Sequence, residues 1–251
     1  MLLAFALAAL DDTNIQIRAR AWFASPDGEF RAFDPPAANT TVDLDVVGLD
    51  ESGFGFMADA RARLWGPLFF TMGYAGNTFS NSRTIATPFT FEGQIFSVGD
   101  RVESELEVRW GTVGVEYDYL WPPYGGWPLH VTPHVAARML LPVVRLENNT
   151  TGVSEDDHFN PIVPEAGVRV RLEPTPWLEI GLGVTGGWGP KFESTDAYFF
   201  EGEVEARILL GAFNIAGGYF YHTLNLDKSR HGDSNLDVDL HGGFLELGVR
   251  F

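Results

Sequence analysis

The last ten residues of the chain, 242–251, constrain its fold more than any other stretch. Every second residue there is apolar, and these residues are Leu245, Leu247, Val249 and Phe251. Mainly polar or small residues occupy the positions between them. Strict alternation is typical of a β-strand with one apolar and one polar face. Soluble proteins rarely expose a strand that finishes on an aromatic side chain. The pattern therefore predicts a strand whose apolar face meets lipid.

This stretch resembles the C-terminal assembly signal of bacterial outer-membrane β-barrels, in which the last strand alternates and finishes on Phe. The resemblance implies a β-barrel in the outer membrane of a Gram-negative bacterium. It implies as partners the barrel-assembly machinery, outer-membrane lipid and lipopolysaccharide. The residues of the expected signal are Leu245, Leu247, Val249 and Phe251.

Ten segments of the chain have the pattern of strands, and each is long enough for a tilted crossing of about 9–11 residues. They are 15–23, 53–65, 68–79, 103–119, 129–146, 164–173, 177–187, 198–210, 213–225 and 236–251. Their connections alternate between long and short, as extracellular loops and periplasmic turns do. Tryptophans flank the short connections, as an aromatic girdle requires, and they are Trp65, Trp121, Trp127 and Trp177. The sequence predicts an all-β fold, a closed antiparallel up-and-down transmembrane β-barrel of about ten strands, with eight or twelve as alternatives.

The alternation changes phase twice, at Gly111-Thr112 and at Gly242-Gly243. A one-residue insertion turns every later side chain to the other face of a sheet, and a β-bulge is such an insertion. We therefore expect a bulge at each position. A misjudged strand boundary is the alternative.

Composition excludes several classes of function. The chain contains no Cys, so it has no disulfide and no thiolate metal site. A net charge of −17 argues against nucleic-acid binding, which needs a basic surface. The apolar run from Met1 to Ala9 is followed by polar residues and is typical of a signal peptide. We expect a signal remnant over 1–10 and a single barrel domain over 11–251, and a buried N-terminal element is the alternative.

Charged residues alternate with apolar ones along several strands, which predicts a polar lumen. The expected lumen-lining residues are Asp59, Arg61, Arg63, Glu103, Glu105, Glu107, Arg109, Arg138, Arg169, Arg171, Glu201, Glu203, Glu205 and Arg207, together with His130, His134, Glu165 and Glu173. Barrels of about eight strands are filled by side chains, whereas open channels have about 16 strands. We expect these charges to pair and fill the interior, and a narrow acidic pore is the alternative.

The last hairpin carries the candidate catalytic group. If its two strands pair around the loop 227–235, His222 lies opposite His241, and Asp239 shares the inward face. Two imidazoles and a carboxylate can form a base with its orienting acid, or bind a transition metal. No serine in a nucleophile motif lies nearby. The sequence therefore assigns no catalytic residue, metal or other cofactor, and these three side chains are candidates alone.

Three further motifs cover the runs 41–50, 89–102 and 113–120. Together they resemble a loose group of uncharacterised small outer-membrane barrels with an Asp-rich first loop. The resemblance implies the barrel fold and implies no activity.

Two classes of function follow from these patterns. The first is a non-catalytic outer-membrane barrel that acts as a narrow porin-like conduit, or as a structural barrel whose long loops contact a protein partner. The second is an outer-membrane hydrolase of the protease, lipid A deacylase or phospholipase type, with His222, His241 and Asp239 in the upper lumen. A soluble β-protein is a third alternative.

Overall fold

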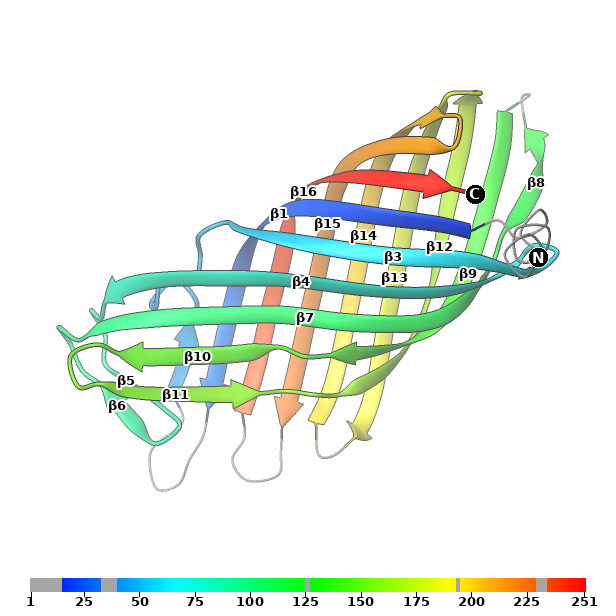
Figure 1. Cartoon of the computed structure of the whole chain (residues 1–251). Helices are drawn as coiled ribbons and strands as arrows, with labels where there is room; N and C mark the ends of the chain where they lie inside the picture. The colour runs from blue at the N-terminus through cyan, green and yellow to red at the C-terminus, as the bar shows by residue number, and fades with distance from the viewer. Residues whose placement is uncertain (1–14, 33–39, 125–126, 193–194, 229–233) are drawn as a thin grey trace, which may run out of the picture.

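The computed structural model describes residues 15–32, 40–124, 127–192, 195–228 and 234–251, and every regular element in them is a β-strand. Ten long antiparallel strands form a closed barrel (Figure 1), because β7 pairs with β9 and the first strand pairs with the last. In order around the barrel they are β1 (Ile15–Ala32), β3 (Gly53–Trp65), β4 (Leu68–Thr84), β7 (Arg101–Tyr117), β9 (Trp127–Leu140), β12 (Ile162–Thr175), β13 (Leu178–Phe192), β14 (Thr195–Leu210), β15 (Phe213–Lys228) and β16 (Ser234–Arg250). The prediction of ten strands is confirmed.

Six short strands accompany the barrel wall: β2 (Thr40–Asp43), β5 (Phe89–Phe91), β6 (Gln94–Phe96), β8 (Tyr119–Tyr124), β10 (Val143–Asn148) and β11 (Val153–His158). β10 continues β9 along β7 without a change of register, since Leu140 pairs with Trp110 and Val143 with Glu107. Pro142 interrupts this strand because proline has no backbone N–H to donate. The strand expected over 129–146 is therefore present in two pieces.

The two ends of the barrel differ. The short connections and the first and last described residues lie together, and the backbone N–H of Ile15 donates to the carbonyl of Phe251 at 3.3 Å. We call this the short-turn end. β2, β5, β6, β10 and β11 lie at the opposite, long-loop end (Figure 1). The expected signal segment 1–10 falls outside the described residues.

An apolar band surrounds the barrel in the half nearer the short-turn end. Its exposed outward side chains include Ile17, Phe56, Met72, Val113, Val135, Leu182, Leu245 and Leu247. Trp65, Trp121, Trp127 and Trp177 are at least half exposed and lie beside the short turns. A closed ring of strands satisfies its backbone groups without water, and an outward apolar band with aromatic flanks is the lipid surface of an outer-membrane-type barrel. The chain is a transmembrane β-barrel of this type. No helix that could span a membrane occurs in the described residues.

β7 extends beyond the band, and its pattern inverts as it does so. Val113 faces outward inside the band, whereas farther along Glu105 faces outward and Leu106 and Val108 are buried inside. The β4–β7 register runs without a shift from Leu68 opposite Tyr117 to Thr84 opposite Arg101. The bulge expected at Gly111-Thr112 is therefore wrong.

β16 inverts in the same way. Leu245 and Leu247 face outward in the band, whereas nearer the long loops Leu236, Val238 and Leu240 are buried inside. The β15–β16 register has no shift at Gly242-Gly243, so the second expected bulge is also wrong. The outer face meets lipid in one half of the strand and water in the other, and the apolar side chains change sides with that environment.

The part of the barrel beyond the apolar band, which we call the extension, encloses an apolar core. Loop residues supply much of it, with Leu44, Val47, Leu49, Phe91 and Phe96 at most 1% exposed. These side chains pack with inward residues of the wall such as Phe30, Phe79 and Leu106. The loops therefore fill the interior at the long-loop end.

Candidate functional site

The lumen of the band carries most of the charged residues that the sequence placed there. Those on its inward face are Asp59, Arg61, Arg63, His130, His134, Arg138, Glu165, Arg169, Arg171, Glu173, Glu201, Glu203, Glu205 and Arg207. These positions alternate with the lipid-facing side chains on β3, β9, β12 and β14. Strand alternation located them because each of these strands meets lipid on its outer face along most of its length.

Four expected lumen residues lie elsewhere. Glu103, Glu105, Glu107 and Arg109 face outward on the extension, where Arg109 pairs with Glu107, and Glu105 lies 3.3 Å from Arg145. Their placement in the lumen was wrong because β7 has already left the lipid at this height. Charged residues there face water, and the apolar residues between them enter the core.

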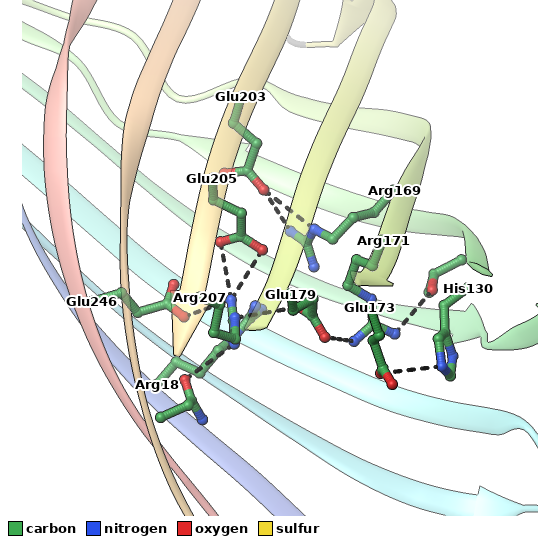
Figure 2. A network of polar contacts seen from close by, with 12 residues as sticks. Arg18, His130, Arg169, Arg171, Glu173, Glu179, Glu203, Glu205, Arg207 and Glu246 are labelled. Carbon is green, nitrogen blue, oxygen red and sulfur yellow. Dashed lines mark hydrogen bonds and ion pairs between the residues drawn. The ribbon is translucent and has the colours of Figure 1, made fainter. Parts of the chain in front are cut away.

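A continuous set of ion pairs crosses the lumen, and we call it the ionic network. Its residues are Arg20, Arg61, Glu116, Asp118, His130, Arg169, Arg171, Glu173, Glu179, Glu203, Glu205, Arg207 and Glu246. Figure 2 shows the side chains of β12, β13, β14 and β16 directed toward one another in its middle. The network ties together strands from all sides of the barrel.

Glu246 is the most buried member of the ionic network. Its side chain is 0% exposed, and it accepts from Arg20 at 2.9 Å and lies 2.9 Å from Arg207. Arg20 also donates to Glu203 at 2.8 Å. Burial of charges is costly unless they are paired and hydrogen-bonded, and here each guanidinium has more than one carboxylate partner.

Five residues of the ionic network were not predicted from the sequence. They are Arg20, Glu116, Asp118, Glu179 and Glu246. The alternation of apolar and charged residues that located the other lumen residues could have identified two of them. Arg20 lies between Ala19 and Ala21, and Glu246 lies between Leu245 and Leu247. Asp118 lies just after β7, and both Arg61 and Arg171 donate to it at 3.0 Å.

A second, smaller group of charges lies between the ionic network and the long-loop end. Arg138 donates to Glu165 at 2.6 Å and to Glu201 at 2.9 Å. Nδ1 of His222 lies 3.4 Å from the same Glu201 carboxylate. Glu201 therefore connects the buried imidazole of His222 to the buried guanidinium of Arg138.

Five aromatic rings form a row between the charges and the apolar core, and we call it the ring row. Phe220 stacks on Trp22 at 4.9 Å, Trp22 contacts Trp110 at 5.3 Å, and His222 follows at 5.0 Å from Trp110. Phe199 completes the row at 5.9 Å from His222. All five side chains are buried. Because they come from β1, β7, β14 and β15, the row spans the lumen.

The candidate catalytic group is not assembled. His222 is inward and 1% exposed, but Leu240 lies opposite it, and His241 lies opposite Tyr221 on the outer face. Asp239 faces outward as well, and its carboxylate contacts Tyr221. The expectation that His222, His241 and Asp239 share the lumen is wrong, because β16 has no bulge to turn the latter two inward. In the described residues, no three His, Asp or Glu side chains are arranged to hold a metal ion.

The comparisons with known proteins found similar solved structures and no related sequence. No protein-family model and no curated protein matches the sequence. Among solved structures, the translocator domain of the autotransporter NalP from Neisseria meningitidis is 13% identical with a TM-score of 0.47, over 100% of this chain and 93% of that one. The outer membrane protease OmpT from Escherichia coli is 10% identical with a TM-score of 0.41, over 95% of this chain and 97% of that one. Neisserial surface protein A is 12% identical with a TM-score of 0.37, over 94% and 97%. At such identities no activity transfers to this chain, and the fold assignment depends on its own closed ring of strands and apolar band.

Proposed function

We propose that this protein is a closed, non-conducting barrel of the bacterial outer membrane that holds a rigid β-extension above the lipid for contact with a partner. One observation supports this proposal above the others: the lumen is filled from the ionic network to the long-loop end. The ionic network occupies the lipid level, the ring row lies above it, and the apolar core fills the extension. A solute path would have to displace all three.

The outer face of the extension is where a partner would bind. It is rich in carboxylates, among them Asp27, Glu29, Asp43, Asp237 and Asp239. Residues of one sign on neighbouring strands attract a surface of the opposite sign and steer its approach. A protein partner would accordingly present a basic face. The porin-like conduit is the competing function, and the two functions differ in whether the barrel conducts ions.

Single-channel recording in a planar bilayer tests the proposal. Refolded protein whose gel mobility changes on boiling is added beside an open porin as positive control. We expect no conductance steps from this protein while the porin conducts. Steady steps with cation preference would contradict the proposal and would establish a narrow acidic conduit.

A further inference from the structure

A cavity opens in the lumen at the short-turn end, below the ionic network. Its volume is about 200 Å³, and its lining includes the β14–β15 turn Gly211-Ala212. A cavity needs at least about 10–15 Å³ to hold one water, so this one has room for several waters or one small ion with its hydration. The lumen is therefore filled at its middle and hollow at this mouth.

Positive side chains predominate in this cavity, although the whole chain has a net charge of −17. Three carboxylates line it, those of Asp118, Glu173 and Glu179. The arginines that line it are Arg61, Arg63, Arg171, Arg207 and Arg250. Since the carboxylates already pair with Arg61, Arg171, Arg207 and His130, they leave no anion for the remaining two guanidiniums.

Arg63 and Arg250 are those two guanidiniums. Within the described residues neither has a carboxylate within ion-pair distance. The guanidinium carbon of Arg63 lies 5.3 Å from the centroid of the Phe69 ring, and Arg61 lies over the same ring at 3.7 Å. The Phe69 ring thus contacts the guanidiniums of both Arg61 and Arg63, and of the two only Arg61 has anionic partners.

Four buried guanidinium Nε atoms at this cavity have no hydrogen-bond acceptor, and they are those of Arg61, Arg63, Arg171 and Arg207. Nε of Arg61 and Nε of Arg207 lie within ion-pair distance of a carboxylate, at 2.6 Å from Glu116 and 3.4 Å from Glu179, which leaves Nε of Arg63 and Nε of Arg171 without an anion. Buried polar groups in native proteins are almost always hydrogen-bonded, so an N–H group at a cavity wall without a protein acceptor can donate to a ligand in the cavity. Guanidinium groups bind carboxylate and phosphate oxygens through paired, charge-assisted hydrogen bonds.

We propose that this cavity binds a phosphate group, held by Arg63 and Arg250. Two cations without partners match the double negative charge of phosphate better than the single charge of a carboxylate. The cavity opens at the mouth opposite the long loops, so the ligand enters from the side that the short turns face. The site is independent of whether the barrel conducts.

Phosphate binding is measured by isothermal titration calorimetry of the folded protein in detergent micelles, with inorganic phosphate as the probe. The variants are Arg63→Gln and Arg250→Gln, and Arg145→Gln is the matched control, because it removes the same charge from the extension. We expect saturable binding that weakens at least about tenfold in each cavity variant, equivalent to about 1.4 kcal/mol. Arg145→Gln should bind as the unmodified chain does.

Three outcomes would overturn the proposal: no saturable binding, equal binding by all variants, or acetate binding more tightly than phosphate. Glycerol 3-phosphate, titrated in parallel, identifies the source of the group. Equal affinity for both probes points to free phosphate, and higher affinity for glycerol 3-phosphate points to a phosphate monoester. Each variant is used only if its gel mobility still changes on boiling, so that a loss of binding is not a loss of folding.

Discussion

At the scale of single residues, the lumen is stabilised by charges that are buried and shared. Glu246 illustrates this, because its carboxylate serves both Arg20 and Arg207 and is excluded from water. A buried pair is weak evidence of net stability, yet removing one partner leaves an uncompensated charge. Because one buried carboxylate pairs with two guanidiniums, its replacement by a neutral side chain should destabilise the fold.

Glu246→Gln should lower the free energy of unfolding by about 3–5 kcal/mol, since two buried guanidiniums lose an anionic partner. Glu105→Gln is the matched control on the outer face, where Glu105 and Arg145 are both partly exposed. An exposed pair contributes at most about 1 kcal/mol. Urea unfolding in lipid vesicles, followed by tryptophan fluorescence, gives both values, and equal losses would contradict a buried ionic network.

The ring row depends on a glycine beside it. A Cβ on Gly55 would lie 1.5 Å from Nε1 of Trp22, so Trp22 would have to leave its place between Phe220 and Trp110. Gly55→Ala should therefore destabilise the barrel by about 1–3 kcal/mol, as overpacking does, and change the near-ultraviolet circular dichroism of the tryptophans.

Gly111→Ala is the control for this change. The one atom within 4 Å of its Cβ would be the Gly73 carbonyl oxygen at 3.9 Å. Its effect should stay within about 0.5 kcal/mol, as for an ordinary surface change. A neutral Gly55→Ala would show that Trp22 does not occupy the described position.

At the scale of elements, long strands such as β7 and β16 pass through two environments. β7 shows this in one continuous run, with Val113 outward in lipid and Glu105 outward in water. The side-chain period of a strand is two throughout, so the same face serves both. The reversal of polarity along that face therefore marks the height at which the wall leaves the membrane.

Val113→Lys and Glu105→Lys test this boundary with the same new side chain on the same face of β7. A lysine at Val113 meets lipid and should cost about 2–4 kcal/mol. A lysine at Glu105 remains in water and should cost less than about 1 kcal/mol. Urea unfolding in vesicles measures both variants, and similar costs would place the two positions in one environment.

At the scale of the whole molecule, the barrel has a lumen filled from the ionic network to the long-loop end, an apolar band, and an acidic extension opposite the short turns. The chain has no cysteine, so an introduced one reports its own exposure without background. This gives a direct test of which end faces the cell exterior.

Glu105→Cys and Gly211→Cys place a thiol at opposite ends of the barrel. A membrane-impermeant maleimide applied to intact cells should label position 105, since the proposed orientation puts the extension above the outer leaflet. Position 211 should be labelled only after the outer membrane is permeabilised, because the same orientation puts its turn in the periplasm. Labelling of 211 alone in intact cells would reverse the proposed orientation.

The sequence by itself determined the ten strands, their antiparallel order and the inward face of most strands in the lipid. It did so because alternation and turn spacing are local properties, visible in segments such as Glu201–Arg207 without reference to any other segment. Arg169 and Glu203, for example, were both placed in the lumen by alternation.

Only the tertiary structure decided where the apolar side chains change faces and which charges meet. Alternation identifies the residues that share a face, but it does not say whether that face meets lipid, water or a packed interior. That depends on the height of each residue along the barrel and on loops such as 85–96 that fill the far end. For this reason Glu105 and His241 were placed inward by the pattern and lie outward in the fold.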